Sequence, residues 1–575
     1  MLKIISPLLF IFLLPVFIIA QSIVGKGKAV DPYHYTIQKN QTFSKGAVAC
    51  AHPIASNVGA AILKQGGNAI DAAIATQLAL AVVYPGAGNI GGGGFMVVSL
   101  KDGKNVTLDY RETAPAKASR DMYLDDKGNA QSNLSQYGHL ASGVPGTISG
   151  LFAGMKYAKL PFKTLIQPAI DLAEKGFTLT KAEASKYNSE QADFKKYNTI
   201  LPVFVKESSW KAGDTVVQHD LANTLKRIRD KGAAGFYEGE TAKLIVEEMK
   251  RGKGLITLDD LKNYQTKERK PIQFDYKEYT IVSMPPPSSG GILLWQMLKM
   301  VEKRPLASYG FETAKSVQLM TEAERRAYAD RAEHLGDPDF WKVPSKEITS
   351  EAYLIKRMAD YDSTKAGKSA GIKAGVIEST ETTHISAIDQ WGNMASVTTT
   401  LNGNFGNKTV AGGAGFFLNN EMDDFSSKPG VPNMYGAIGG EANAIAPGKR
   451  MLSSMTPTIV LKDGKPFMVV GTPGGTTIPT SVFQTIIDVI DFKMNPSDAV
   501  NKPKFHHQWL PDELVVEKGF PQDVTNQLTQ MGYTIKGYNV PGYEVVIGRV
   551  ELIKVTNGKF EAVADKRGDD SVAGY

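Results

Sequence analysis

Two threonines that could supply catalytic hydroxyl groups are predicted to face each other across a β-hairpin. The runs HISAI and MASVTTT alternate as strands do, and the five residues 389–393 between them form the turn. In an antiparallel hairpin, residues equally distant from the centre of the turn lie opposite each other. A turn centred on Trp391 therefore places Thr382 opposite Thr400.

Two further hairpins are predicted to end in residues suited to chemistry. The Asp463-Gly464 turn places a pair of serines beside a pair of glycines, and the Asp102-Gly103 turn places an arginine beside a glycine-rich run. Ser453 is expected opposite Gly474 and Arg111 opposite Gly94, with Ser454 and Gly475 at the same open end of their hairpin. Because a shift by one residue turns every side chain to the other face, the clustering is a firmer expectation than the individual pairs.

Each of these residues also has an ordinary structural explanation. Threonine is favoured in strands, a glycine pair often marks a bend, and an exposed arginine is usually solvated. Taken singly, each residue favours the structural explanation. Their convergence at hairpin ends, after a polar segment at residues 361–381, favours a common site.

Two short motifs match functional patterns only in part. The run Gly91–Gly94 lacks the Lys-Ser/Thr of a phosphate-binding loop and precedes a strand, so it predicts a backbone packed against another segment or donating amides. The run Gly367–Gly371 matches GxSxG but lacks the strand and helix that hold a catalytic serine. We interpret the second match as chance.

The elements that must position these residues are helices and antiparallel strand pairs. The stretch from Ala55 to Val83 predicts a buried helix, and Glu312 to Leu335 predicts an amphipathic one. The Asp102-Gly103 turn joins FMVVSL to NVTLDY, the Asp463-Gly464 turn joins TIVL to PFMVV, and a fourth hairpin is predicted at ELIKV/FEAV. Residues 361–381, rich in Lys, Gly, Ser and Thr, predict a flexible linker or exposed loop. This mixture indicates an α+β protein whose antiparallel sheets are covered by helices.

The composition excludes several classes of protein and of site. With 575 residues, 42% hydrophobic and 22% charged, the chain is neither disordered, collagenous nor coiled-coil. Its net charge of +6 is small and scattered, so we expect no nucleic-acid partner. Cys50 is the only cysteine, and the eight histidines include no HExxH or HxxxH pair. We therefore expect no intrachain disulfide and no metal site.

The first twenty residues have the pattern of a signal peptide. One lysine precedes an apolar run from Ile4 to Ala20, and the polar pair Gln21-Ser22 follows. Two prolines make this run a poor spanning helix, and no later segment is long and apolar enough to cross a bilayer. We expect cleavage after Ala20 and an exported protein, periplasmic or secreted, without a stable membrane anchor.

Several motifs, taken in order, closely resemble those of the gamma-glutamyltransferases (gamma-glutamyl transpeptidases). They are TTHISAIDQWGNMASVTTTLNGNFG from Thr382, then LNNEMDDFSSKPGVPNMYG, MLSSMTPTIVLKDG and GTPGGT, within a match that runs from KGAVACAHPIAS to the closing SVAGY. These are N-terminal nucleophile hydrolases that cut themselves to expose a catalytic threonine. The resemblance implies a four-layer αββα sandwich and a heterodimer of a large subunit, residues 21–381, and a small subunit, residues 382–575.

The implied chemistry explains why a threonine must become a chain terminus. A threonine hydroxyl is nearly inert near neutral pH, whereas a free α-amino group with a pKa of about 7.7 to 8.0 can serve as its base. The resemblance implies that Thr382 first attacks the carbonyl of Glu381 and then the γ-amide of a donor such as glutathione. Water, an amino acid or a peptide then takes the γ-glutamyl group, Thr400 orients the nucleophile, and no cofactor is needed.

The resemblance also assigns roles to the other clustered residues. The amides of Gly474 and Gly475 would form the oxyanion hole. The donor's charged groups would be held by two sets of residues: Arg111, Ser453 and Ser454 for the α-carboxylate, and Asn402, Glu421 and Asp424 for the α-ammonium. Position 421 is Glu where some bacterial relatives have Gln. Tyr435 belongs to a stretch, Pro429 to Gly436, that resembles the lid loop of some members.

Two other interpretations stay open at this point. A cephalosporin or glutaryl acylase shares the nucleophile and the maturation but binds a donor without the α-ammonium, and the retained Asn402, Glu421 and Asp424 argue against it. A secreted binding protein that never matures also fits the signal peptide and the sandwich. Such a protein would give a single band near its full mature mass on a denaturing gel.

Overall fold

The computed structural model describes residues 30–369, 382–428, 430–434, 436–437, 439–537 and 546–575. The predicted signal peptide, Glu381, Tyr435 and the end of the predicted linker, residues 370–381, lie outside the described residues. Over the ranges just given, the search for a helix with the length and apolar character of a membrane span finds none.

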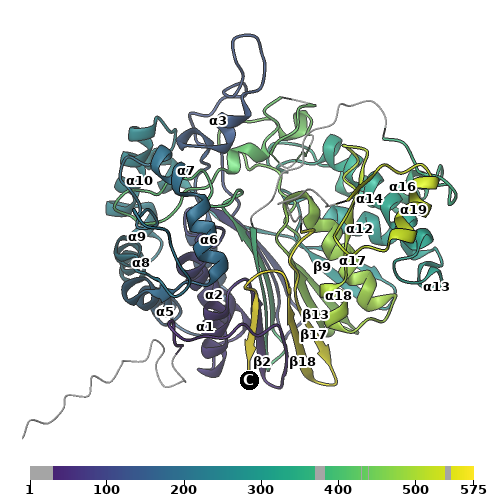
Figure 1. Cartoon of the computed structure of the whole chain (residues 1–575), viewed down its shortest axis with the longest axis horizontal. Helices are drawn as coiled ribbons and strands as arrows, with labels where there is room; N and C mark the ends of the chain where they lie inside the picture. The colour runs from purple at the N-terminus through teal and green to yellow at the C-terminus, as the bar shows by residue number, and fades with distance from the viewer. Residues whose placement is uncertain (1–29, 370–381, 429, 435, 438, 538–545) are drawn as a thin grey trace, which may run out of the picture.

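Two antiparallel seven-stranded sheets stand face to face in the middle of the molecule (Figure 1). The first sheet has the order β19 (Ser571–Gly574), β2 (Gly46–Cys50), β10 (Thr382–Asp389), β11 (Met394–Thr400), β3 (Gly93–Ser99), β4 (Asn105–Asp109) and β7 (Lys267–Arg269). The second has the order β1 (Asn40–Phe43), β18 (Lys559–Ala564), β17 (Glu551–Thr556), β13 (Lys465–Gly471), β12 (Thr458–Lys462), β9 (Tyr279–Ser283) and β8 (Ile272–Tyr276). Smaller sheets join β5 (Phe177–Thr178) with β6 (Thr215–Val216), and β14 (Phe505–His506) with β15 (Leu514–Val516) and β16 (Ile535–Gly537).

Helices cover the outer face of each large sheet, at the left and right of Figure 1. On the first sheet lie α1 (Pro53–Lys64) and α2 (Ala69–Val83), with α5 (Phe162–Lys175) and α8 (His219–Lys231) outside them. On the second lie α12 (Gly290–Glu302) and α17 (Ile478–Ile490), with α14 (Ala314–His334) packed on α12. Apolar side chains from both sheets, among them Phe95, Val97, Val282, Ile459 and Val469, fill the space between them. The predicted four-layer αββα sandwich is thus confirmed.

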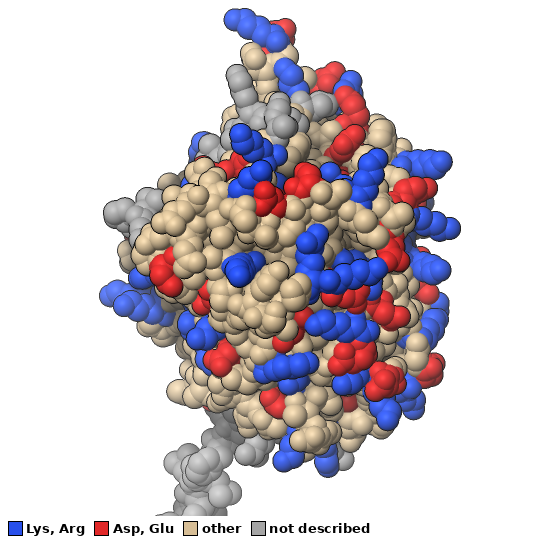
Figure 2. All heavy atoms as spheres, turned by 90° about the vertical axis from the view of Figure 1, so that its right-hand side faces the viewer, with Lys and Arg blue, Asp and Glu red and all other residues tan. Residues whose placement is uncertain are grey.

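The remaining α-helices complete the two outer layers and the loops around them. They are α3 (Ser132–Gln136), α4 (Thr147–Gly154), α6 (Lys181–Ser189), α7 (Gln191–Tyr197), α9 (Ala234–Tyr237), α10 (Gly239–Gly252), α11 (Leu258–Asn263), α13 (Leu306–Tyr309), α15 (Ser345–Ile348), α16 (Glu351–Arg357), α18 (Pro496–Asn501) and α19 (Gln522–Gln530). On the face at the right of Figure 1, acidic and basic side chains are interspersed (Figure 2). Lys299 of α12 pairs there with Glu302, and Lys303 pairs with Glu351, so charges of opposite sign neutralise each other locally.

The buried helix predicted between Ala55 and Val83 is in fact two helices. Gly66 has a φ of 91°, a left-handed conformation that ends α1 and suits glycine. The Asn68 side chain then accepts hydrogen bonds from the amides of Ile70 and Asp71, both at 3.0 Å, and so begins α2. The break brings the two helices side by side over the first sheet.

The helix predicted from Glu312 to Leu335 is confirmed as α14, but it is not amphipathic in its packing. Its polar residues Gln318, Glu322 and Glu324 are as buried as its apolar ones, because α19 and neighbouring loops also pack against this helix. Partners on those loops satisfy the polar groups; for example, the amide of His507 donates to Glu324 at 2.9 Å. The charged pattern therefore reflects buried polar contacts rather than solvent exposure.

The predicted register is confirmed for one of the three site hairpins. In the β10–β11 hairpin, Thr382 lies opposite Thr400, and the same register holds down to Ile388 and Met394 beside the turn. Asp389 stabilises that turn by accepting hydrogen bonds from the amides of Trp391 at 2.8 Å and Asn393 at 3.1 Å. The turn chemistry alone therefore sets which threonines meet.

The other two registers are wrong in detail. Gly94 pairs with Tyr110 rather than Arg111, because the loop between β3 and β4 takes five residues, 100–104. Ser453 lies outside β12, and a bulge between Val460 and Leu461 shifts the register of β12 and β13 by one residue. Ser453 instead forms a parallel bridge with Ser288. The clustering at one end of the sheets survives both corrections.

Candidate active site

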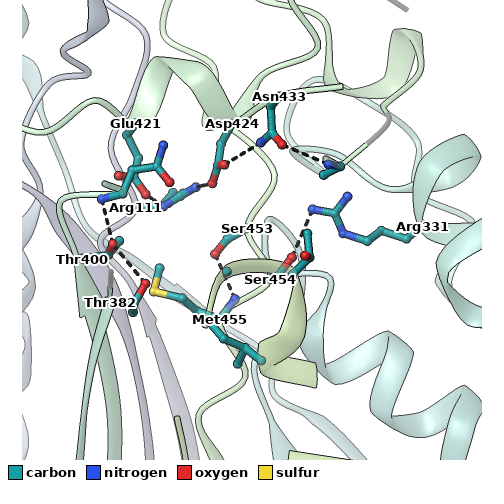
Figure 3. Close-up of a pocket in the computed structure, with 15 residues that line it drawn as sticks. Arg111, Arg331, Thr382, Thr400, Glu421, Asp424, Asn433, Ser453, Ser454 and Met455 are labelled. Atoms are coloured by element: carbon teal, nitrogen blue, oxygen red, sulfur yellow. Dashed lines mark hydrogen bonds and ion pairs between the residues drawn. The ribbon is translucent and has the colours of Figure 1, made fainter. Parts of the chain in front are cut away.

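A small pocket opens where the hairpins of the two sheets end (Figure 3). The turns of the β10–β11 and β12–β13 hairpins lie at the opposite end of the sheets. The start of β10, the end of β11 and the segments flanking β12 and β13 therefore meet at this pocket. The residues lining it that the sequence predicted are Arg111, Thr382, Thr400, Asn402, Glu421, Asp424, Ser453, Ser454 and Gly475. Gly474 adjoins Gly475, whereas Glu381 and Tyr435 lie outside the described residues.

Thr382 and Thr400 lie at one side of this pocket, on central strands of the first sheet. Their hydroxyl oxygens are 3.4 Å apart, and Thr382 is only 4% exposed. The amide of Asn402 donates to the Thr400 hydroxyl at 2.8 Å, which fixes that oxygen beside Thr382. The pair can therefore act as a nucleophile and the group that orients it.

The glycine run of β3 makes room for this arrangement. A Cβ on Gly92 would lie 2.2 Å from the carbonyl oxygen of Thr400, and one on Gly94 would lie 2.5 Å from that of Thr398. The side-chain amide of Asn89 also donates to the Thr400 carbonyl, at 2.9 Å. The predicted close packing of the glycine backbone against another segment is confirmed.

Arg111 lies two residues beyond β4 and is 1% exposed. Its guanidinium contacts the carboxylates of Glu421 and Asp424, which begin and end the 3₁₀ helix η3 (Glu421–Asp424). Its Nε donates to the Met451 carbonyl at 3.2 Å. The resemblance assigned Arg111 to the donor's α-carboxylate and the two acids to its α-ammonium. In the structure, these two sets of predicted binding residues form ion pairs with each other.

Three carboxyl groups share this buried region. Glu112 has both oxygens buried without a hydrogen-bond partner among the described residues, and the nearer lies 3.8 Å from Arg111 Nη1. Burial raises the pKa of Glu112 to about 7, against the opposing effect of Arg111. Burial likewise raises the pKa of Glu421 and that of Asp424, although Arg111 favours their ionised forms. The region thus holds a surplus of acidic groups, and an added ammonium would stabilise their charge.

Backbone amides and hydroxyls close the other side of the pocket. Gly474 has a φ of 140° and Gly475 a φ of 52°, conformations that favour glycine, and they lead through η5 (Gly475–Thr477) into α17. At the start of a helix the amides carry a partial positive charge and point outward. The hydroxyl of Ser453 accepts from the Met455 amide at 3.1 Å, and the carbonyl of Ser453 accepts from the Ser289 amide at 2.8 Å.

Arg331, Asn433 and Glu112 are among the polar residues of this region that sequence reasoning missed. Arg331, from the last turn of α14, points into the pocket and donates to the Ser454 hydroxyl at 3.2 Å (Figure 3). Asn433 donates to Asp424 at 3.1 Å. The only sequence signal for Glu112 is its position next to Arg111. A helical arginine and a loop asparagine carry no comparable signal.

The chain is similar in sequence and fold to several known proteins. The family model described as Gamma-glutamyltranspeptidase matches residues 55–575. The chain is 48% identical, over 96% of its length and 95% of the relative's, to a glutathione hydrolase proenzyme of Escherichia coli. A gamma-glutamyltranspeptidase structure from Helicobacter pylori is 44% identical and covers 55% of this chain and 92% of its own, with a TM-score of 0.54.

An acylase structure is similar in fold but more distant in sequence. The cephalosporin acylase from Bacillus halodurans covers 95% of this chain and 99% of its own with a TM-score of 0.81, at 27% identity. The αββα sandwich is therefore shared by both kinds of enzyme, and the sequence match distinguishes them. With its family model spanning most of the chain, and with a pocket built from the family's motifs, this protein belongs to the gamma-glutamyltranspeptidase family.

Proposed function

We propose that the chain is the precursor of a gamma-glutamyltransferase that also hydrolyses glutathione and related γ-glutamyl compounds. The observation that carries this proposal is the pocket in which the hydroxyls of Thr382 and Thr400, 3.4 Å apart, share one cavity with a guanidinium and two carboxylates. A γ-glutamyl donor brings an α-ammonium and an α-carboxylate, and such groups bind charges of both signs within one small pocket. The similarity to a glutathione hydrolase proenzyme supports the same activity.

Maturation is proposed to be a self-cleavage. The Thr382 hydroxyl attacks the carbonyl carbon of Glu381, the peptide bond to the Thr382 nitrogen breaks, and water hydrolyses the resulting ester. The products are the large subunit, residues 21–381, and the small subunit, residues 382–575. The described part of the predicted linker is held in place at Ser369, whose amide donates to Asp512 at 2.7 Å. This contact lies twelve residues before the proposed cut.

The sheet topology supports a stable heterodimer after that cut. β10 and β11 of the small subunit lie between β2 and β3 of the large one, and β19 pairs with β2 on its other edge. Backbone hydrogen bonds of the first sheet therefore cross the subunit boundary repeatedly. We infer that the two subunits stay together without a covalent link.

In the proposed reaction, the freed amine of Thr382 takes the hydroxyl proton as the oxygen attacks the γ-carbonyl of the donor. The amides of Gly474 and Gly475 stabilise the oxyanion, and Thr400 orients the nucleophile. The donor amine leaves with a proton, and a γ-glutamyl ester of Thr382 remains. Water releases glutamate from this ester, and an amino acid or peptide acceptor forms a new γ-glutamyl amide instead.

Donor binding is proposed to use the charges already paired in the pocket. The α-ammonium takes a place beside Glu421, Asp424 and Asn402, and the α-carboxylate lies near Arg111 and the pair Ser453 and Ser454. The surplus of acidic groups favours the ammonium, which a glutaryl donor lacks. This is the specific reason to prefer a transferase over an acylase. Tyr435 stays a predicted part of a lid loop.

The site of action is proposed to be outside the cytoplasm, periplasmic or secreted, on the strength of the predicted signal peptide. Glutathione is the default donor, and no cofactor takes part in the proposed steps. The acceptors proposed are amino acids and peptides.

The test combines a denaturing gel with a donor assay. We expect two bands, the smaller beginning at Thr382 by N-terminal sequencing, and release of nitroaniline from γ-glutamyl-4-nitroanilide. Thr382→Ala should stay one chain without activity, whereas the control Thr383→Ala, whose side chain points to the other face of β10, should still be cut. A fragment beginning at residue 382 from Thr382→Ala would mean that an external protease cuts the chain. Faster hydrolysis of glutaryl-4-nitroanilide than of the γ-glutamyl donor would favour the acylase.

A further inference from the structure

Arg331 differs from every other buried arginine of the described residues. Five arginines there are less than a tenth exposed, namely Arg111, Arg325, Arg326, Arg331 and Arg450. Four of them form ion pairs with carboxylates. Arg331, 7% exposed, donates instead to two hydroxyls, from Nε to Ser289 and from Nη2 to Ser454, both at 3.2 Å. Within the ranges that the structure describes, no carboxylate pairs with it.

A buried guanidinium without a counterion is costly to keep in a folded protein. Removal of a charge from water costs several kcal/mol, and only a nearby opposite charge or good hydrogen bonds recover it. The position of Arg331 in the last turn of α14, where helix carbonyls concentrate partial negative charge, recovers a small part. Burial lowers the pKa of Arg331, yet an arginine stays charged at neutral pH. The charge of Asp424 also favours the charged form of Arg331, but no carboxylate of the described residues contacts the guanidinium, so we expect the anionic group of a ligand to take that place.

The pocket shows where that anion would lie. Arg331 and Arg111 line it from opposite sides, with Ser453 and Ser454 between them (Figure 3). Arg111 already contacts Glu421 and Asp424, whereas two hydroxyl contacts leave most of the five N–H groups of Arg331 for a ligand. The hydroxyl that Arg331 contacts belongs to Ser454, one of the two serines proposed to bind the donor's α-carboxylate.

We propose that Arg331 is a second cationic contact for the α-carboxylate of the γ-glutamyl donor, held in place by Ser289 and acting beside Ser454. This inference rests on the proposed function. The α-carboxylate then lies against Arg331 while the α-ammonium lies against Glu421 and Asp424. A zwitterionic donor is bound in this way without loss of the ion pairs that Arg111 makes.

Two anilide donors that differ only in the α-carboxylate test the proposal. They are γ-glutamyl-4-nitroanilide and 4-aminobutyryl-4-nitroanilide. For Arg331→Gln, we expect kcat/KM on the γ-glutamyl donor to fall about 10- to 100-fold, mostly through KM, because a charge-assisted contact is lost. The 4-aminobutyryl donor should change less than about threefold, and Arg331→Lys should lie between the wild type and Arg331→Gln on the γ-glutamyl donor. The ratio of the two kcat/KM values does not depend on the active fraction of a preparation.

Arg326→Gln is the matched control, because Arg326 is a buried arginine of the same helix that pairs with Glu322 and Asp360 away from the pocket. It should lower thermal stability without a change in the donor ratio. An equal fall on both donors in Arg331→Gln would overturn the proposal and leave Arg331 a structural residue. If Arg331→Gln fails to mature, the ratio in Arg331→Lys decides in the same way.

A glutathione assay separates the two carboxylates that Arg331 could meet. A small hollow lined by Tyr328, Arg331, Trp509 and Leu510 adjoins the pocket, and the carboxylate of a leaving peptide could reach it. A loss on glutathione with unchanged γ-glutamyl-4-nitroanilide kinetics would overturn the assignment to the α-carboxylate. A wild-type enzyme inactive on every γ-glutamyl donor would contradict the proposed function itself, whereas an active wild type with an unchanged ratio in the variants contradicts this inference alone.

Discussion

Arg111→Lys removes the planar fork that joins the two halves of the proposed donor site while keeping its charge. In the structure the two terminal nitrogens of Arg111 reach different carboxylates, those of Glu421 and Asp424, and Nε reaches the Met451 carbonyl. The single ammonium of lysine cannot make all three contacts from one position. At least one carboxylate therefore loses its partner in a buried region.

The size of the effect follows from those lost contacts. A hydrogen bond to a charged group contributes about 1.5 to 3 kcal/mol, and an unpaired buried partner adds to the loss. We expect a cost of about 2 to 4 kcal/mol in transition-state binding, which is roughly a 30- to 1000-fold fall in kcat/KM on γ-glutamyl-4-nitroanilide. Maturation should proceed, because Arg111 contacts the donor site and not the bond to be cut.

Steady-state kinetics of the purified, matured variant check this expectation. Arg120→Lys is the control, since Arg120 is about half exposed and pairs with Glu441 at the surface, and it should stay within about twofold of the wild type. In a double-mutant cycle, Arg111→Lys and Asp424→Asn should be non-additive by about 1 kcal/mol or more, because the two side chains are in contact. Unchanged kcat/KM in a normally matured Arg111→Lys, or strict additivity in the cycle, would refute the reasoning.

Three further outcomes are expected. Activity should fall about tenfold per pH unit below the pKa of the Thr382 amine, which is about 7.7 to 8.0 in peptides. Acetylation of that amine after maturation should abolish the activity. Full activity of the acetylated enzyme would remove the amine from the mechanism. Gly474→Ala should lower kcat about 100-fold or more, since the added Cβ would lie 2.5 Å from a neighbouring hydroxyl oxygen. The control Gly464→Ala, with open space around the Cβ, should leave kcat unchanged. Equal kcat values in the two variants would contradict the oxyanion role of Gly474. Burial lowers the pKa of His506 and of His507 to about 4. Their contribution to the free energy of unfolding is therefore complete above about pH 6.5 and is lost as the pH falls toward 4, by up to about 1.4 kcal/mol per pH unit for each histidine. A melting temperature that stays flat from pH 7 to pH 5 would contradict this.

Features that depend on neighbours along the chain could be predicted from the sequence. The turn at Asp389 to Asn393 aligns Thr382 with Thr400, because a five-residue turn and the alternation of two strands leave one register. The order of the motifs likewise indicated the family, and with it the sandwich. The register prediction held because turn chemistry and strand period act over a few residues, whereas the family and the sandwich rested on the resemblance of the motifs.

The pairing of the charged residues could not be predicted in this way, because it depends on how distant segments pack. Arg111 pairs with the acids that the motifs assign to the donor's other charged group, and Ser453 lies before β12, where it bridges to Ser288 rather than to Gly474. Arg331 comes from α14, the helix packed on α12 over the second sheet, and lies 51 residues before Thr382 along the chain. Its sequence surroundings match those of a solvated surface arginine. Such a residue becomes part of the site because helix packing buries it beside Ser454 and away from any carboxylate partner among the described residues. Burial and charge pairing depend on the whole fold, and local sequence patterns do not encode them.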